Sequence, residues 1–109
     1  MTTPFACDMT AIPVEERPVH HALIRRLMTE AVGETRELPD GIAFRFPAEE
    51  YGAVTRFVAR ERLCCPFLRF TIEVAPEQGP LWLRLTGPAG VTAFIRAELH
   101  LPAQHNVAG

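Results

Sequence analysis

Apolar side chains recur at helical spacing, three and four residues apart, in three segments of the chain. The first segment runs from Pro18 to Gly33, and its apolar stripe is Val19, Leu23, Ile24, Leu27, Met28 and Ala31. The second has helical spacing through Val54, Phe57, Val58 and Glu61, and it ends at Pro66 because a proline pushes the preceding residue out of helical geometry. The third is short, with Thr86 or Gly87 as its cap and Val91, Phe94 and Ile95 facing the core. The pattern predicts three amphipathic helices.

Strict alternation of apolar and polar residues predicts four strands in two hairpins. The first hairpin turns at Pro39-Asp40-Gly41 and directs Ile42, Phe44 and Phe46 to one face. In the second, the inward positions are Leu68, Phe70, Ile72, Val74, Leu81, Leu83 and Leu85. The order helix, hairpin, helix, hairpin, helix predicts an α+β fold, in which three helices pack on one face of a four-stranded, mostly antiparallel sheet.

Length and composition predict one domain. A chain of 109 residues that is 48% hydrophobic can bury a core of its own. We place this domain at residues 1–101 and expect a flexible tail at 102–109. No run of about 18 apolar residues and no signal peptide is evident, so we expect a cytoplasmic protein with no membrane segment.

The charges exclude several classes of function. The formal net charge is −2 and no long run of one sign occurs, whereas nucleic-acid binders usually show a basic excess. Direct binding of nucleic acid is therefore not expected. All eleven basic residues are arginines, which excludes a lysine Schiff base and a phosphate-binding lysine of the Walker type.

The chain has three cysteines, and two of them, Cys64 and Cys65, stand side by side before Pro66. The cytosol keeps thiols reduced, so we expect free thiols or a metal site more than a disulfide framework. Helical spacing places Glu61 one turn before both cysteines. A purely structural interpretation also exists, because free cysteine often behaves as a small buried hydrophobe and Glu61 can pair with an arginine.

A soft-metal site is the first functional interpretation. Thiolates suit Cu(I), Zn(II) and Hg(II), and Cys7 would have to fold back onto Cys64 and Cys65 as a third thiolate. Glu61, Asp8 or a histidine would complete the ligand set. His20 and His21 point about 100° apart on a helix, so we do not expect both of them to bind the same metal ion. His20 lies on the same side of its helix as Ile24. It is either a fourth ligand of the metal or an ordinary histidine at the edge of the core.

Redox chemistry and nucleophilic catalysis are the other two chemical interpretations. A disulfide between adjacent cysteines is strained, since their Cα atoms lie about 3.8 Å apart, so Cys7 is the easier partner for Cys64 or Cys65. Catalysis ranks last, because the C-terminal end of a helix raises the pKa of a thiol. The sequence identifies no catalytic residue.

The outward face of the sheet offers a separate candidate surface. If the predicted register holds, it gathers Arg45, Arg69, Arg84 and Trp82. A solvated face with one aromatic side chain explains the pattern without a function. Arginine and tryptophan are also enriched in interface hot spots, so a ligand surface or a homodimer interface is the alternative.

The segments "FVARERLCCPFLRFTIEV" and "GPLWLRLTGPAG", with the early Ala6-Cys7, resemble a group of small bacterial proteins that carry an E-R-x-C-C-P-F motif. Related sequences are associated with regulators of the MerR type, which respond to metals. The resemblance implies metal or stress sensing through Cys7, Glu61, Cys64 and Cys65. The chain has no helix-turn-helix of its own, so the resemblance implies a regulator protein or a second copy as partner. The predicted function is binding of a soft metal or thiophilic ligand, for sensing or sequestration.

Overall fold

Helices and hairpins alternate along the chain in the predicted order. The computed structural model describes residues 6–101. The helices are α1 (Arg17–Arg26), α2 (Tyr51–Cys64) and α3 (Val91–Glu98), and the strands are β1 (Glu34–Leu38), β2 (Gly41–Phe46), β3 (Arg69–Val74) and β4 (Leu81–Thr86). The predicted tail at 102–109 lies outside the described residues.

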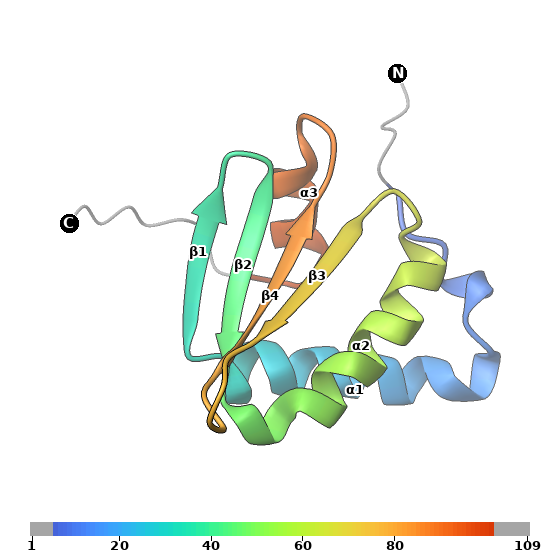
Figure 1. Cartoon of the computed structure of the whole chain (residues 1–109). Helices are drawn as coiled ribbons and strands as arrows, with labels where there is room; N and C mark the ends of the chain where they lie inside the picture. Colours follow the sequence, from blue (N-terminus) through green and yellow to red (C-terminus); the bar gives the residue numbers. More distant parts are fainter. Residues whose placement is uncertain (1–5, 102–109) are drawn as a thin grey trace.

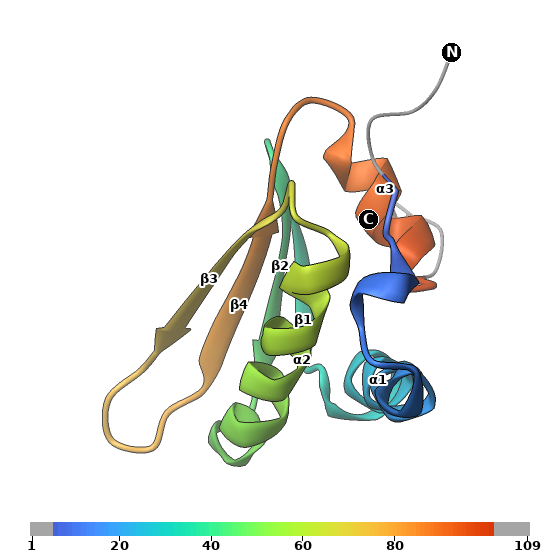
Figure 2. The same ribbon diagram turned by 90° about the vertical axis from the view of Figure 1, so that its right-hand side faces the viewer.

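The four strands form one antiparallel sheet in the order β1-β2-β4-β3, so each hairpin contributes one central strand and one edge strand (Figure 1). All three helices lie on the same side of the sheet (Figure 2). The predicted α+β fold is therefore confirmed. No helix between residues 6 and 101 has the length and apolar character that crossing a lipid bilayer requires.

The core lies between the two central strands and α2. The inward side chains of these strands are at most 1% exposed: Ile42, Phe44, Phe46, Leu81, Leu83 and Leu85. Val54 and Phe57 of α2 are fully buried as well. Burying an apolar side chain of this size stabilises the fold by about 1.5–3 kcal/mol, so this layer supplies much of the hydrophobic stabilisation.

Two apolar residues do not face the core as predicted. Val19 of α1 is 56% exposed, and the fully buried residue beside it is His20. Adjacent helical side chains point about 100° apart, so the stripe that faces α2 runs through His20, Ile24 and Leu27 instead. Val74 is 54% exposed because it ends β3, an edge strand with a neighbour on one side only.

The third helix begins later than predicted. Thr86 belongs to β4, and the backbone N–H of Gly87 donates to the carbonyl of Asp40 at 3.0 Å, which holds this residue at the end of the sheet. Gly90 then takes a left-handed conformation with φ of 92° and precedes Val91, the first residue of α3. Glycine adopts this φ at little cost, so the chain turns into the helix at Gly90.

The ends of α1 are irregular. A 3-10 turn at Val14–Glu16 leads into the helix, and a π-helical turn at Leu27–Ala31 follows it. Before these turns the chain runs along the end of α2, where Ile12 is fully buried and the side chain of Arg17 donates to the Ile12 carbonyl at 2.9 Å. These contacts hold the N-terminal segment against the helical layer.

Candidate functional site

The last turn of α2 presents Glu61, Cys64 and Cys65 together. The backbone N–H of Cys65 still donates to the carbonyl of Glu61 at 2.8 Å, but Cys65 has left helical geometry, with φ of −123° and ψ of 70°. Pro66 explains this change, because the residue before a proline avoids the helical region. The predicted end of the second helix is therefore confirmed, and the break turns Cys65 toward the N-terminal segment.

A backbone hydrogen bond brings Cys7 to this end of α2. The N–H of Asp8 donates to the carbonyl of Cys64 at 2.9 Å, and Cys7 precedes it. The carboxylate of Asp8 accepts from the backbone N–H of Thr10 at 3.0 Å and caps the turn Met9–Ala11. The hydroxyl of Thr10 also donates to this carboxylate, and the hydroxyl and backbone hydrogen bonds together lower the pKa of Asp8. Asp8 therefore caps a turn, and it is not part of the cluster of potential metal ligands that Cys7, Glu61, Cys64 and Cys65 form.

Cys7 and Cys65 form a disulfide, with their Cα atoms 4.8 Å apart, whereas Cys64 is a free buried thiol. The expectation of three free thiols is therefore wrong for this structure, because it rested on the redox state of a compartment and not on geometry. The weaker expectation, that Cys7 pairs with one of the two adjacent cysteines more easily than they pair with each other, agrees with the disulfide.

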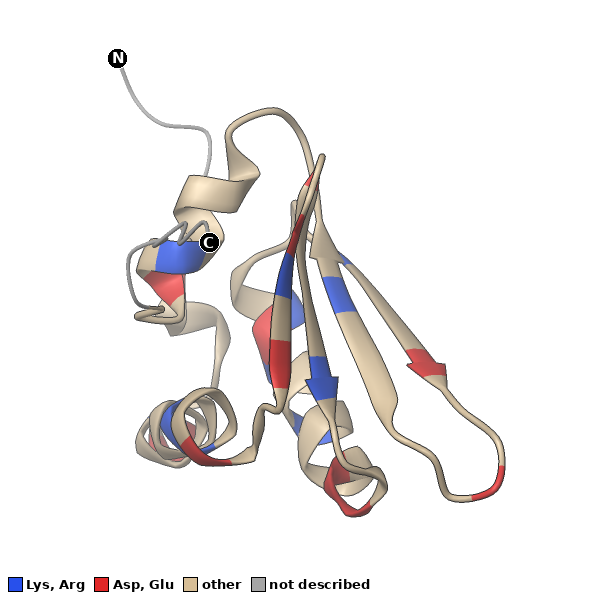
Figure 3. Ribbon diagram, turned by 90° about the vertical axis from the view of Figure 1, so that its left-hand side faces the viewer, with Lys and Arg blue, Asp and Glu red and all other residues tan. Residues whose placement is uncertain are grey.

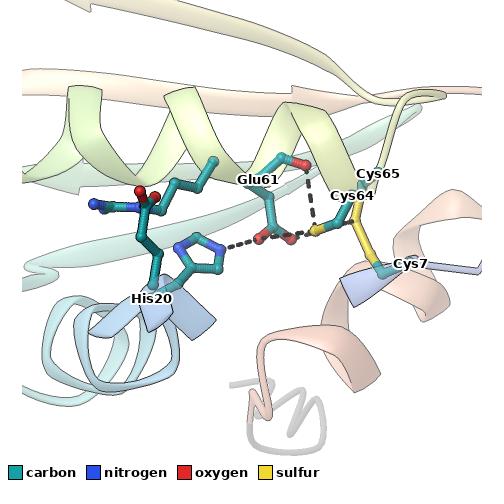
Figure 4. Close-up of polar contacts among 7 residues, drawn as sticks. Cys7, His20, Glu61, Cys64 and Cys65 are labelled. Carbon is teal, nitrogen blue, oxygen red and sulfur yellow. Dashed lines mark hydrogen bonds and ion pairs between the residues drawn. A yellow bond between two sulfur atoms is a disulfide. The ribbon is translucent and has the colours of Figure 1, made fainter. Parts of the chain in front are cut away.

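The predicted ligand set converges in one place. One ligand atom from each of Cys7, Glu61, Cys64 and Cys65 lies within 4.8 Å of all the others, so the cluster can hold a metal ion once the Cys7–Cys65 disulfide is reduced. The Cys64 and Cys65 sulfurs are 3.8 Å apart, and Oε2 of Glu61 lies 3.4 Å from the Cys65 sulfur. Figure 4 shows Glu61 between the cysteines on one side and His20 on the other.

His20 is the partner of Glu61. Nε2 of His20 lies 2.8 Å from Oε1 of Glu61, and both residues are fully buried. The ring of His20 also stacks on Phe57, with centroids 5.9 Å apart. The sequence placed His20 on the correct side of its helix but left open whether it was a metal ligand. The structure makes it the group that holds the carboxylate, and Glu61 pairs with His20 and not with an arginine.

One nitrogen of His20 has no hydrogen-bond partner. Nδ1 is buried and contacts no donor or acceptor among residues 6–101. When Nε2–H donates to the Glu61 carboxylate, Nδ1 remains as a polar atom with no partner of its own. A buried polar atom without a hydrogen bond destabilises the folded state, so such atoms are unusual in a protein core. They are more common at functional sites.

Burial and negative charge keep Cys64 protonated. Loss of solvent is the main cause that raises the pKa of the Cys64 thiol to about 12, and the negative charges of Glu61 and Glu98 contribute to the same increase. A thiol with this pKa is a poor nucleophile at neutral pH, which argues against catalysis by Cys64. Burial also raises the pKa of Glu98, with a contribution from Glu61, to about 7.

The second candidate surface lies on the side of the sheet away from the helices. Arg45 stands opposite Trp82 across β2 and β4, and Arg84 lies opposite Thr71 of β3. Arg45 pairs with Glu34 at 3.4 Å, and Arg84 pairs with Glu73 at 2.9 Å. Charged residues of both signs therefore lie along the strands (Figure 3), which differs from a uniformly basic anion-binding face.

Trp82 forms the centre of this surface. It is partly buried, and the guanidinium of Arg36 lies 4.8 Å from the centroid of its ring. A hollow of about 410 Å³ lies beside it and is lined by residues that include Arg36, Arg84 and Glu73. Arg69 lies near the end of the same face, opposite Thr86. The four residues that the sequence assigned to this surface are thus on it.

Comparison with known proteins finds no matching family model, no matching curated protein and no matching solved structure. The resemblance to proteins associated with MerR-type regulators therefore stays a prediction from the sequence.

Proposed function

We propose that the reduced protein binds a soft metal ion through Cys7, Cys64 and Cys65, with Glu61 as the fourth ligand. The convergence of these four ligand atoms within 4.8 Å is the observation that carries the proposal. Cys7 is 57 positions away from Cys64 along the chain, so their meeting is a property of the fold and not of local spacing. Thiolate ligands favour Hg(II), Cu(I) and Zn(II) over hard ions such as Mg(II).

The distances suit a metal of this kind. Metal–sulfur bonds of about 2.3 Å in a tetrahedral site place neighbouring sulfurs about 3.8 Å apart. The Cys64 and Cys65 sulfurs already have a separation of 3.8 Å. The sulfurs of Cys7 and Cys65 must first be released from the disulfide, which takes two electrons and two protons from a thiol reductant. The disulfide form is then the oxidised state that cannot bind metal with all three sulfurs.

Glu61 and His20 support this role. A metal-binding carboxylate is usually held by a further hydrogen bond, and Nε2 of His20 supplies one at 2.8 Å. Burial of the site excludes competing water, because Glu61, Cys64 and Cys65 are all fully buried. Binding must displace the thiol proton of Cys64 despite its raised pKa, so the affinity for metal rises with pH.

The biological role that we propose is sensing or sequestration of a soft metal in the cytoplasm, with a regulator protein or a second copy of the chain as partner. The sequence resemblance to proteins associated with MerR-type regulators supports this role. The disulfide supports a link between metal binding and redox state, since oxidation removes two of the three thiol ligands.

Metal titration of the reduced protein tests the proposal. We expect Hg(II), Cu(I) or Zn(II) to raise the midpoint of thermal unfolding, because a ligand bound only by the native state stabilises it. Cys7→Ser, Cys64→Ser and Cys65→Ser variants are each expected to weaken binding, whereas Thr55→Ser, at a partly exposed position of α2, serves as control. Unchanged unfolding midpoints with all three metals would rule the proposal out.

A second candidate function uses the sheet face that carries Trp82. The hollow beside Trp82 and the arginines around it favour a dimer interface or a binding surface for a non-metal ligand, with the cysteines in a structural role. Sedimentation of the wild type and of Trp82→Thr tests the dimer. A monomeric wild type whose tryptophan fluorescence responds to no added ligand would remove this candidate.

A further inference from the structure

A cavity of about 590 Å³ opens beside the disulfide. Its walls come from three parts of the chain: the N-terminal segment with Cys7 and Met9, helix α1 with the turn after it, and the end of α3. Figure 2 shows the N-terminal segment passing α3 and then reaching α1, on the right of the view and away from the strands. The volume is sufficient for a small organic molecule.

Cys7 is the sulfur that this cavity exposes. Cys7 lines the cavity and is partly buried, whereas Cys64 and Cys65 are fully buried and do not line it. A reagent in the cavity therefore meets the disulfide from the side of Cys7.

Attack from within the protein is sterically disfavoured. The sulfur of Cys64 lies 3.8 Å from that of Cys65, so Cys64 is close enough to displace Cys7. The product would be a disulfide between adjacent residues, whose Cα atoms are about 3.8 Å apart, below the usual range for disulfides. An external reductant therefore has the easier path, through the cavity.

The lining indicates what kind of molecule fits. Ile24, Met28 and Leu99 supply an apolar wall. Arg25 lies at the same cavity, is exposed, and has no acidic side chain as partner among residues 6–101. Glu98 is the acid among the lining residues, and its burial weakens its negative charge near neutral pH. An apolar wall beside an unpaired guanidinium suits a small molecule that carries a carboxylate.

We propose that this cavity admits a small thiol bearing a carboxylate, which opens the disulfide by attack at Cys7. The thiolate of the small molecule forms a bond to the Cys7 sulfur, and the bond between Cys7 and Cys65 breaks. The electron pair leaves on the Cys65 sulfur, which takes up the proton that the small thiol lost on ionisation. A second small thiol then displaces Cys7 from the mixed disulfide, so that two small thiols are oxidised to one disulfide and both cysteines are reduced.

The consequence of this exchange for metal binding rests on the proposed function, but the exchange itself does not. The test therefore uses the oxidised protein in metal-free buffer with a chelator, and the metal titration is a separate experiment. A protein that exchanges thiols but binds no metal would contradict the proposed function alone. A protein that binds metal but shows no preference among thiols would contradict the cavity proposal alone.

The experiment compares 3-mercaptopropionate with the neutral thiol 2-mercaptoethanol at equal thiolate concentration, and mass spectrometry of quenched samples follows reduction. We expect Arg25→Gln to slow the carboxylate thiol about two- to fivefold, the range for one exposed ionic contact, and to leave the neutral thiol unchanged. Arg56→Gln, at an exposed position of α2 outside the cavity, is the matched control and should change neither rate.

Two further readouts keep the result decisive. Ala97 lines the cavity and is exposed, so Ala97→Phe should slow both thiols by narrowing the opening, while thermal unfolding shows that the variant is folded. Peptide mapping of the trapped mixed disulfide should find the adduct on Cys7. Adducts on Cys65, equal effects of Arg25→Gln on both thiols, or a protein that forms no Cys7–Cys65 disulfide on oxidation would each overturn the proposal.

Discussion

Nε2 of His20 lies 2.8 Å from Oε1 of Glu61, and this pair joins α1 to α2 in a region without access to solvent. The two residues are 41 positions apart in the chain, so the contact belongs to the tertiary fold. The other oxygen of the same carboxylate faces the cysteines, 3.4 Å from the Cys65 sulfur. Glu61 thus connects a buried histidine to the sulfur cluster.

Breaking this pair is expected to destabilise the protein strongly. His20→Phe keeps the stacking on Phe57 but leaves the Glu61 carboxylate buried without its partner, which costs about 3–5 kcal/mol. Glu61→Met should cost a similar amount. The double variant should be more stable than the sum of the single effects predicts, by about 1–3 kcal/mol, because it leaves no unpaired polar group. Urea denaturation of the four proteins measures this coupling.

His21→Phe is the control for the single change, because His21 is exposed on the same helix and should shift stability by no more than about 0.5 kcal/mol. Additive effects of His20→Phe and Glu61→Met would show that the two side chains do not interact in solution.

The sequence predicted the sheet and the helices because their core positions repeat with a period. The inward residues of β2 and β4 alternate strictly, and Val54, Phe57 and Glu61 share one face of α2, as the structure confirms. The exposure of Val74 was missed because alternation identifies the face of a strand but not whether the strand lies at an edge. The start of α3 was missed because Thr86 and Gly87 fit a helix cap by local rules, whereas the chain turns into the helix at Gly90.

The site was predicted in part for the same reason. The grouping of Glu61 with Cys64 and Cys65 follows from helical spacing, but the approach of Cys7 depends on a hydrogen bond from Asp8 to Cys64 and on the burial of Ile12. The N-terminal segment has no periodic pattern, so its path could not be derived. The sequence also left the role of His20 open, since helical spacing gives its side but not the residue it meets on α2.

The disulfide should contribute substantially to stability. It closes a loop across a sequence separation of 58, and linking residues this far apart in the unfolded chain is worth about 4 kcal/mol by the chain-entropy estimate. Cys7→Ser should therefore lower the free energy of unfolding of the oxidised protein by about 2–5 kcal/mol. Guanidinium denaturation of wild type and variant, each with and without reductant, measures the effect.

Reductant should have little effect on the free energy of unfolding of Cys7→Ser, because this variant has no disulfide to lose. Equal stability of oxidised and reduced wild type would contradict the prediction and would indicate that the Cys7–Cys65 bond does not form in solution.

Glu98 should make stability depend on pH. Its pKa is raised to about 7 in the folded protein from an ordinary value of 4.5, mainly by burial. The folded state then binds more protons than the unfolded state between these values, so its contribution to stability is fully present below pH 4.5 and is lost as the pH rises through about 7. At pH 8, Glu98→Gln should stabilise the protein by about 1–2 kcal/mol, since the full shift is reduced by partial exposure.

Thermal unfolding from pH 4 to pH 8 measures this effect. The unfolding midpoint should depend less on pH in Glu98→Gln than in the wild type. Glu15→Gln, at an exposed position, is the control and should leave the curve unchanged. If the unfolding midpoint of the wild type rises between pH 5 and pH 7, and Glu98→Gln shows the same rise, then Glu98 titrates normally.

Cysteine alkylation should follow the order of exposure and pKa. In the reduced, metal-free protein at pH 8, iodoacetamide should modify Cys7 first, because Cys7 is partly exposed, and Cys64 last. A pKa of about 12 leaves roughly one part in ten thousand of the Cys64 thiol ionised at this pH, and burial limits access further. Mass spectrometry of peptides gives the rate at each cysteine, and denaturation in urea should remove the differences.

Glu61→Gln removes one of the charges that raise the pKa of Cys64, so it should speed alkylation of Cys64, whereas Glu15→Gln should not. A saturating soft metal should protect all three cysteines in the wild type, because each sulfur is then a ligand. Protection of Cys64 and Cys65 without Cys7 would contradict the three-thiolate site, since it would leave the metal on the adjacent pair alone.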